Sequence, residues 1–207
     1  LIQPWRFYFQ LETDEGFFFV TRWGLQGYHP TDSRAFTVNT RLRTASWVPQ
    51  ATFYQIFPDR FRKGSMELGV RAKEYEFDGH LTTTREFNEP PLAYQEGWCL
   101  DFFNGDLQGI IDSIPYFLEL GITAVYLNPI FSARTNHRYD CVDFFHIDPH
   151  IGGDEGFCRL VEALHAVGIK CMLDISINHT GIDHPWFIKA KKDSDSEIGR
   201  ASCRERV

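Results

Sequence analysis

The feature that most constrains this chain is a regular alternation of apolar strand segments with amphipathic helical segments between residues 52 and 175. Three apolar, β-rich runs, at 52–57, 122–127 and 171–175, have the composition of strands that are covered on both faces. The segments between them carry apolar residues three and four positions apart, as one helix face does: Leu107, Ile110, Ile111, Ile114, Phe117 and Leu118, then Phe157, Leu160, Val161, Leu164 and Val167. Strands joined through helices in this way pair in parallel by right-handed crossovers. We therefore expect an α/β fold, either an open sheet or a (β/α)8 barrel.

Single residues predict where these helices begin, break and end. Gly121 and Gly168 follow the last apolar position of each helical pattern, so we expect them to terminate the helices. Pro115 lies inside the first pattern and removes a helical N–H donor, which predicts a kink or two short helices. Asp154 precedes the second pattern and is expected to be its N-cap.

The N-terminal segment has a different pattern. Aromatic runs at 5–9, 17–20 and 35–38 are separated by turn residues, which is typical of short antiparallel strands. We interpret residues 1–46 as the C-terminal part of a β-sandwich domain and residues 47–179 as the N-terminal part of the α/β domain. Residues 180–197 then begin the excursion after the third strand.

Charge and cysteine usage exclude several classes of protein. The chain has 21 Lys and Arg against 28 Asp and Glu, a net charge of −7, so the basic surface of a nucleic-acid-binding protein is missing. Five cysteines without a C-x-x-C pair argue against a disulfide framework and a zinc ribbon, and they favour the reducing cytoplasm. No apolar run approaches the roughly 20 residues of a membrane span, so we expect no membrane partner.

Both ends of the sequence are expected to be cut. The chain begins LIQP rather than with Met, so a targeting signal upstream is neither shown nor excluded. Residues 198–207, IGRASCRERV, resemble a translated sequencing adapter, and we treat them as a non-native tail. We call the complete polypeptide the parent protein.

The longer loops follow the expected strands rather than precede them. Residues 58–106 follow the first strand, residues 128–153 the second, and residues from 178 onward the third. Because barrel enzymes build their sites at the C-terminal ends of the strands, we expect the functional residues in these loops.

Five motifs in these strands and loops resemble one family, in order from about residue 47 to 187. They are FYQIFPDRF (53–61), FNGDLQG (103–109), LELGITAVYLNPI (118–130), HRYD (137–140) with DFFHIDP (143–149), and LDISINH (173–179). They resemble the α-amylase family of glycoside hydrolases, most closely the maltodextrin glucosidase, cyclomaltodextrinase and neopullulanase group. The resemblance implies a (β/α)8 TIM barrel, with this chain supplying its first three βα units after the β-sandwich.

The resemblance also implies which side chains hold the sugar. Tyr139 corresponds to an aromatic platform under the sugar at the cleavage position, and a flat ring suits the C–H face of a pyranose. Asp174 is implied to help order a neighbouring Arg, Asn178 to support the loop, and His179 to hydrogen-bond the same sugar. The carboxylates Asp140, Asp143 and Asp148 are implied to brace the loop instead.

The catalytic groups implied by the family lie beyond residue 207. Retaining hydrolysis needs a nucleophilic carboxylate and an acid/base carboxylate about 5 to 5.5 Å apart. The family places them after later strands. We expect the parent protein to hydrolyse α-glucosidic bonds in maltodextrins or related α-glucans without a cofactor, and the 207-residue chain alone neither to fold stably nor to be active. A transglycosylating relative and a non-catalytic scaffold are the alternatives, and a homodimer through the N-terminal domain is a possible assembly.

No metal site is expected either. Some relatives bind calcium through the segment that corresponds to residues 104–106 together with ligands after the first strand. Here residues 62–67 supply Arg and Lys instead of Asn and Asp, so we expect residues 104–106 to cap a helix.

Overall fold

The structure is a computed structural model that describes residues 5–38 and 44–193. The chain divides into two compact units, Leu1–Gln50 and Ala51–Val207, which we describe separately. The expected non-native tail at 198–207 lies outside the described residues. The domain boundaries drawn from the sequence stay predictions.

The smaller unit is built from short antiparallel strands. Its elements are β1 (Trp5–Phe7), β2 (Phe9–Thr13), β3 (Gly16–Thr21), β4 (Gly24–Gln26), a 3-10 turn at Asp32–Arg34, β5 (Phe36–Val38) and a 3-10 turn at Val48–Gln50. β1 pairs with β5, and β2, β3 and β4 form a meander. The aromatic run at 5–9 is thus divided at Tyr8 between two sheets, and β4 is an additional strand. The antiparallel pairing agrees with the prediction, whereas the β-sandwich stays a prediction.

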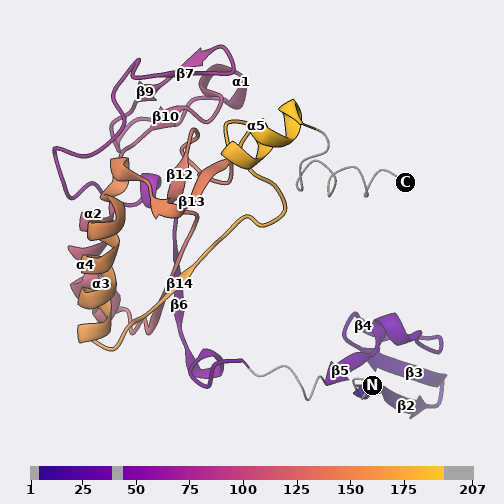
Figure 1. The fold of residues 1–207 in the computed structure, drawn as a ribbon. Coiled ribbons are helices and arrows are strands. Elements are labelled where there is room, and N and C mark those ends of the chain that lie inside the picture. Colours follow the sequence, from indigo (N-terminus) through magenta and orange to yellow (C-terminus); the bar gives the residue numbers. More distant parts are fainter. Residues whose placement is uncertain (1–4, 39–43, 194–207) are drawn as a thin grey trace. The chain divides into compact units, whose positions relative to one another are not determined.

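The larger unit contains a three-stranded parallel sheet. It is formed by β6 (Phe53–Ile56), β11 (Ala124–Leu127) and β14 (Lys170–Leu173), in the spatial order β14-β11-β6. The register places Ile56, Leu127 and Leu173 side by side. Helices α2 (Leu107–Ile111), α3 (Ile114–Glu119) and α4 (Gly153–Ala166) connect the strands. Figure 1 shows the helices α2, α3 and α4 together on one side of β6 and β14. The expected parallel α/β arrangement is therefore confirmed for these three strands.

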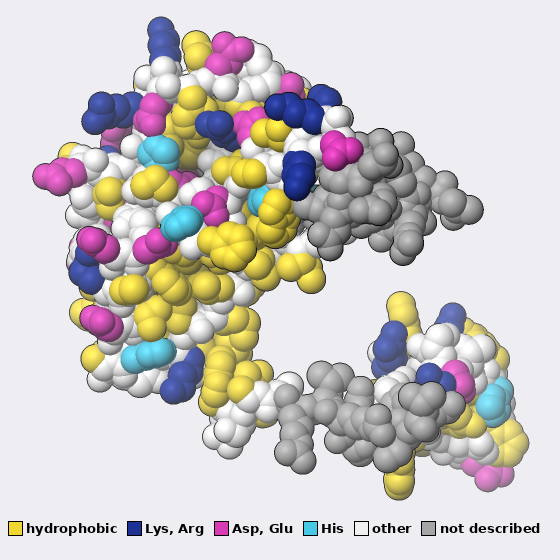
Figure 2. Space-filling model, in the orientation of Figure 1, with side chains coloured by type: hydrophobic (Ala, Val, Ile, Leu, Met, Phe, Trp, Pro, Cys, Tyr) yellow, Lys and Arg dark blue, Asp and Glu magenta, His cyan; other side chains and the backbone are white. Residues whose placement is uncertain are grey.

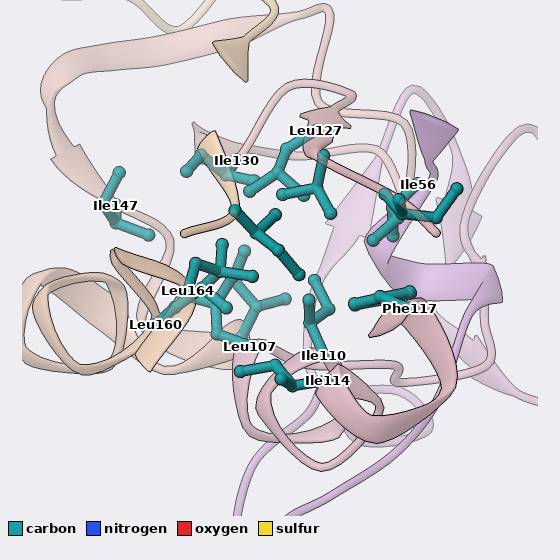
Figure 3. Packing of buried hydrophobic residues seen from close by; sticks show 14 residues of the cluster. Ile56, Leu107, Ile110, Ile114, Phe117, Leu127, Ile130, Ile147, Leu160 and Leu164 are labelled. Atoms are coloured by element: carbon teal, nitrogen blue, oxygen red, sulfur yellow. The ribbon is translucent and has the colours of Figure 1, made fainter. Parts of the chain in front are cut away.

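The main core lies between the helices and one face of this sheet (Figure 3). Side chains alternate along each strand, so Ile56, Leu127 and Leu173 belong to this core, whereas Gln55, Tyr126 and Met172 occupy the neighbouring register position on the opposite face. The helices contribute the apolar residues that the spacing predicted, of which these are fully or nearly fully buried: Leu107, Ile110, Ile114, Phe117, Leu160 and Leu164.

The helix boundaries follow the glycine and proline positions closely, with one exception. Pro115 is the second residue of α3, which begins at Ile114, so the first helical pattern forms two short helices, as expected. Gly121 and Gly168 have φ values of +70° and +79°, which suits the predicted helix ends. The expectation for Asp154 was wrong: α4 begins at Gly153 with Gly152 as N-cap. Asp154 lies in the first turn, where its carboxylate accepts the Ile147 N–H at 2.8 Å.

The loops after the strands carry the remaining elements. The loop after β6, residues 58–106, is called the excursion from here on. It contains a 3-10 turn (Pro58–Arg60), β7 (Glu76–Phe77), β8 (His80–Leu81), β9 (Thr83–Thr84), α1 (Tyr94–Gly97) and β10 (Asp101–Phe102). The loop between β11 and α4 forms a hairpin of β12 (Phe131–Ala133) and β13 (Cys141–Ile147), followed by a 3-10 turn at Pro149–Ile151. After β14 the chain reaches α5 (Pro185–Lys192). Across the two described ranges, no helix combines the length and apolar character needed to cross a membrane.

A joint made only of main chain fixes the start of the excursion against the first helix. A Cβ atom on Gly64 would lie 2.3 Å from the Gly109 nitrogen, and one on Gly109 would lie 2.1 Å from the Arg62 carbonyl oxygen. Real Cβ atoms do not approach backbone so closely, so both positions require glycine. We call this contact between Arg62–Gly64 backbone and Gly109 the glycine joint.

We predict that Gly109→Ala lowers the stability of the parent protein by about 1 to 3 kcal/mol, because the new methyl group collides with backbone that has no room to shift. Gly156→Ala is the matched control. Gly156 also lies inside a helix, but its Cβ would meet the nearest atom, Leu107 Cδ1, at an ordinary 3.6 Å. Alanine there should be neutral or stabilising by about 0.5 to 1 kcal/mol. Thermal unfolding of both variants measures the difference, and equal melting temperatures would disprove the joint.

Candidate sugar-binding site

The site begins at the C-terminal end of β14. Asp174 directly follows this strand, and its backbone N–H donates to the Leu127 carbonyl at 2.9 Å, which keeps it beside the end of β11. The Tyr139 hydroxyl, from the turn between β12 and β13, donates to Asp174 Oδ2 at 2.5 Å. The fold therefore brings together two of the four predicted sugar-binding residues, although 35 positions separate them in the sequence.

This hydrogen bond favours the protonated phenol. The bond to Asp174, together with burial, raises the pKa of Tyr139 to about 12. A phenol is protonated at neutral pH even at its ordinary pKa of about 10, and the raised pKa extends this hydrogen-bond-donating state to higher pH. A ring held in this way presents a fixed apolar face to a ligand, which is what a stacking platform requires.

The other two predicted residues, Asn178 and His179, form a second pair in the loop after β14. The Asn178 amide lies 3.3 Å from His179 Nδ1, and both side chains are exposed. His179 is also within electrostatic reach of His137, on the Tyr139 turn: burial lowers the pKa of His137, and the charges of Arg138 and His179 lower it further. The exposed imidazole of His179 is thus free to contact a ligand near the turn.

An apolar hollow adjoins this second pair. It has a volume of about 610 Å³, and its lining includes Asn178 and His179 with Phe144, Ile177 and Trp186. A slightly larger hollow of about 700 Å³ lies on the excursion and contains none of the four predicted residues. The volume of a hollow is therefore no guide to the sugar-binding site here, because the larger hollow does not contain the predicted residues.

The structure adds polar residues that sequence reasoning missed. Gln55 of β6 donates to the Asn128 side chain, just after β11, at 2.8 Å. Tyr126 of β11 lies beside Asp174: burial raises its pKa, and Asp174 raises it further. Both Gln55 and Tyr126 occupy the strand face opposite the core. A polar residue at the outward position of an otherwise apolar strand was the signal that could have identified them.

The turn that carries Tyr139 is braced by a carboxylate. Asp140 accepts the backbone N–H groups of Arg134 at 3.1 Å and Thr135 at 3.2 Å, and it also accepts the Thr135 hydroxyl. The Tyr139 N–H donates to His137 Nδ1 at 3.1 Å. These contacts agree with the bracing role that the sequence suggested for Asp140.

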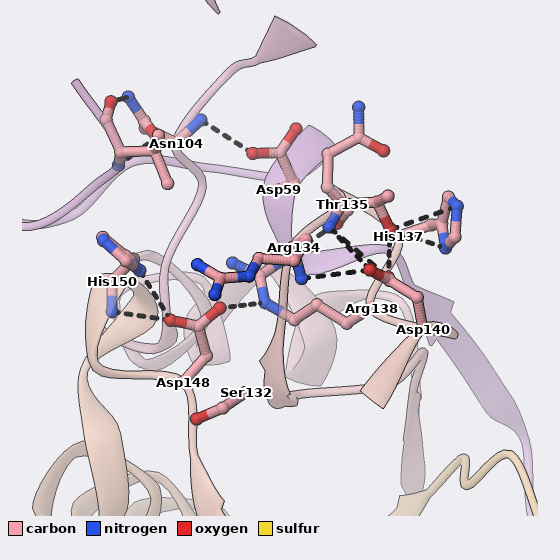
Figure 4. A network of polar contacts seen from close by, with 12 residues as sticks. Asp59, Asn104, Ser132, Arg134, Thr135, His137, Arg138, Asp140, Asp148 and His150 are labelled. Carbon is pink, nitrogen blue, oxygen red and sulfur yellow. Dashed lines mark hydrogen bonds and ion pairs between the residues drawn. The ribbon is translucent and has the colours of Figure 1, made fainter. Parts of the chain in front are cut away.

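A buried ion pair supports the turn from below (Figure 4). Arg138, only 1% exposed, donates from Nε to Asp148 Oδ2 at 2.8 Å and also to the Asn136 carbonyl at 3.0 Å. The second Asp148 oxygen lies 2.8 Å from His150, whose other ring nitrogen lies 2.9 Å from Glu74. Burial alone would raise the pKa of Asp148, but Arg138 and His150 outweigh it and hold the pKa at about 2. Asp148 is therefore charged at neutral pH and braces this loop, as the sequence suggested.

The residues near 104–106 do not fit a calcium ion. Asp106 is the N-cap of α2, as expected: its carboxylate accepts the N–H groups of Gly109 at 2.7 Å, Ser65 at 2.8 Å and Gly64 at 3.1 Å. Hydrogen-bond donors therefore already surround both oxygens of this fully buried carboxylate. Within residues 5–38 and 44–193, no group of three His, Cys, Asp or Glu side chains is placed to hold a metal ion.

We predict that Asp148→Asn destabilises the parent protein by about 3 to 5 kcal/mol, because Arg138 would remain buried without its counter-charge. Asp143→Asn is the control: Asp143 pairs with the exposed His146, and water screens an exposed pair, so its loss should have little effect on stability. Because its folded-state pKa is depressed, Asp148 contributes fully above its ordinary pKa of about 4, and the contribution is lost as the pH falls through about 2. Denaturant unfolding across this pH range measures the free energy of unfolding of both variants. Asp143→Asn keeps Asp148 and should lose stability as the pH falls, so a free energy of unfolding that does not change with pH in either variant would contradict the assignment.

Comparisons with known proteins identify the family of this site. Residues 55–199 match the family model described as "Alpha amylase, catalytic domain". The chain is 40% identical over 154 residues to the intracellular maltogenic amylase of Bacillus subtilis, covering 74% of this chain and 24% of that protein. It is 39% identical over 145 residues to neopullulanase 2 of Thermoactinomyces vulgaris, covering 67% and 21%. The chain thus spans about a quarter of the length of these relatives.

Solved structures give the same result. The ligand-free cyclic α-maltosyl-(1→6)-maltose hydrolase from Arthrobacter globiformis is 38% identical with a TM-score of 0.58, covering 74% of this chain and 31% of that one. The type III pullulan hydrolase from Thermococcus kodakarensis is 26% identical with a TM-score of 0.67, covering 96% and 35%. The resemblance seen in the motifs is therefore confirmed: this chain belongs to the α-amylase family of glycoside hydrolases, whose catalytic domain is a TIM barrel.

Proposed function

We propose that the parent protein hydrolyses α-glucosidic bonds in maltodextrins or related α-glucans. The contact between Tyr139 and Asp174 carries this proposal, because it fixes an aromatic ring at the common edge where the parallel strands end. His179 and Asn178 stand in the loop after the same strand and offer hydrogen-bonding groups to sugar hydroxyls. Fixed aromatic faces combined with exposed polar groups are the usual composition of a sugar site.

The names of the relatives support this substrate class. They include maltogenic amylase, neopullulanase and a cyclic maltosyl-maltose hydrolase. We infer a retaining mechanism in which two carboxylates flank the scissile bond about 5 to 5.5 Å apart. We place those two carboxylates in a segment of the parent protein outside the present chain. In this proposal the residues of the present chain bind and orient the sugar, and none of them is the nucleophile or the acid/base.

We propose that β6, β11 and β14 are the first three strands of an eight-stranded barrel. The sheet face opposite the core is poorly covered among the described residues, and Phe53 is 38% exposed there. Figure 2 shows apolar side chains exposed on the surface of the larger unit. A closed barrel would cover this face with the remaining strands. In the same proposal, the smaller unit is the C-terminal part of a β-sandwich domain. This domain would also supply the contact surface of a homodimer.

We propose the cytoplasm as the location of the parent protein. Cys99, Cys141, Cys158 and Cys171, the cysteines within the described ranges, are all free, which suits a reducing compartment. Burial raises the pKa of Cys141 and of Cys171 to about 11, so these two thiols are unreactive. One relative is itself named an intracellular maltogenic amylase.

The function is tested with the parent protein and maltotriose. Tyr139→Ala should lower kcat/KM by about 10- to 100-fold through loss of the stacking surface, and Tyr139→Phe, which keeps the ring, should lower it less. Tyr116→Ala is the matched control, because Tyr116 is a 46% exposed tyrosine on α3, a helix on the core side of the sheet. Proton NMR of the first product should show the α-anomer. Absence of any α-glucan cleavage by the soluble parent protein would refute the proposal, and longer products would indicate transglycosylation.

A second prediction concerns the chain on its own. We expect the 207-residue polypeptide to show no cooperative melting transition and no cleavage of maltotriose, because three strands cannot close a barrel and leave β14 at the edge of the sheet. Calorimetry and product analysis of the purified chain measure these properties. A cooperatively melting preparation that cleaves maltotriose would overturn the expectation.

A further inference from the structure

Asn136 links the Tyr139 turn to the excursion after β6, next to a second contact in which the Tyr75 hydroxyl donates to the Arg134 carbonyl at 2.6 Å. The Asn136 backbone N–H donates to the Cys99 carbonyl at 2.9 Å. Its side-chain amide donates to the Asp101 carbonyl at 3.0 Å and to Asp101 Oδ1 at 3.1 Å. Asp101 and Asn136 are only 3% and 4% exposed, so these hydrogen bonds are shielded from water and none is easily replaced. The turn is thereby attached to a segment that lies far from it in the sequence.

Asp101 is itself held in place by other parts of the excursion. Its second oxygen, Oδ2, accepts the Leu92 N–H at 3.1 Å and a guanidinium N–H of Arg60 at 3.2 Å. Arg60 also donates to the Asp101 carbonyl at 3.0 Å, and its guanidinium lies 4.2 Å from the centre of the Phe103 ring. One oxygen of the carboxylate is thus committed to the excursion, and the other is directed at Asn136. The side chain is a fixed link between the two segments.

The position of Asn136 controls the next residues of the turn. Its carbonyl accepts the Arg138 guanidinium at 3.0 Å, and the same guanidinium is paired with Asp148. Arg138 has a φ of +58°, a left-handed conformation that a non-glycine residue keeps only when its surroundings hold it. Tyr139 comes next in the chain. We therefore expect a displacement of Asn136 to remove one of the two restraints on Arg138, the other being Asp148, and to shift the Tyr139 ring relative to Asp174.

We propose that Asp101 is a positioning residue that, through Asn136, holds the Tyr139 ring in the orientation that receives the sugar. The hydrogen bonds of its side chain go to Leu92, Arg60 and Asn136 rather than to the four sugar-binding residues, so Asp101 acts on the ligand only through the turn. The inference rests on the proposed function, because it assigns the excursion a task in the same site. Asp101 then acts on the binding site, although its segment lies outside the sheet of β6, β11 and β14.

The test is a double-mutant cycle in the parent protein with maltotriose as substrate. Asn136→Ala removes the side-chain part of the link and leaves the ion pair between Asp101 and Arg60 in place. Asp101→Ala removes the carboxylate, and with it both the bond from Oδ1 to Asn136 and the ion pair, while the Asp101 carbonyl stays. Each should lower kcat/KM about tenfold, mainly through KM, since a displacement of about 1 Å has effects of this size or more. In a Tyr139→Ala background, the same two substitutions should change kcat/KM by less than about twofold, because the ring that they position is absent.

Thr82→Val is the matched control. Thr82 is fully buried in the excursion, and its hydroxyl bonds to Arg71 and Glu74, so its loss should lower the melting temperature and leave KM unchanged. Equal losses of kcat/KM from Asn136→Ala in both backgrounds would overturn the positioning role and show a general structural one. An unchanged KM in Asn136→Ala would overturn it as well. The proposed function fails separately, if the soluble parent protein does not cleave maltotriose at all. If Tyr139→Ala alone leaves kcat/KM unchanged, the assignment of Tyr139 fails, and the positioning role of Asp101 fails with it. If Asp101→Ala does not fold, Asn136→Ala decides the question.

Discussion

Parallel, in-register pairing of β6, β11 and β14 is the constraint on which the rest of this structure depends. It places Ile56, Leu127 and Leu173 side by side, so the residue after each strand emerges at the same edge of the sheet. Apolar contacts between these strands and α2, α3 and α4 maintain the register. A shift by one residue would turn the core side chains to the opposite face, and the loops that carry Asp174 and Asn128 would no longer meet.

The loops at this edge are organised by buried charge rather than by apolar packing. Arg138, Asp148 and Asp101 are nearly inaccessible to water, and each has partners on more than one segment. Charged groups are costly to bury, and their hydrogen bonds specify geometry more sharply than apolar contacts do. Loops that must present a ring in one orientation benefit from this specificity. The same arrangement makes the site sensitive to the loss of a single partner.

The sequence predicted well the features that depend on local pattern. Strand and helix periodicity located β6, β11 and β14, and Pro115 divided the first helical pattern correctly. Residues next to strand ends, such as Asp174, were identified because their place in the chain sets their place in the fold. Asp154 was misassigned because α4 begins one residue earlier, at Gly153. Gly152, with a φ of +126°, is the N-cap, and the sequence pattern did not reveal this backbone conformation. The contact between Asp101 and Asn136 was not foreseen, because irregular loops bring it about and no periodicity reports it.

The glycine joint has a consequence for how such a protein varies. The contact between the Arg62–Gly64 backbone and Gly109 is made by main-chain atoms, and the Asp106 carboxylate reinforces it by accepting the Gly64 and Gly109 N–H groups. The origin of α2 therefore depends little on which side chains the intervening loop carries. Within that loop, most residues between the joint and Leu92 are suited to exchange as a cassette, whereas Tyr75, Leu92 and Asp101 must stay because they hold the Tyr139 turn.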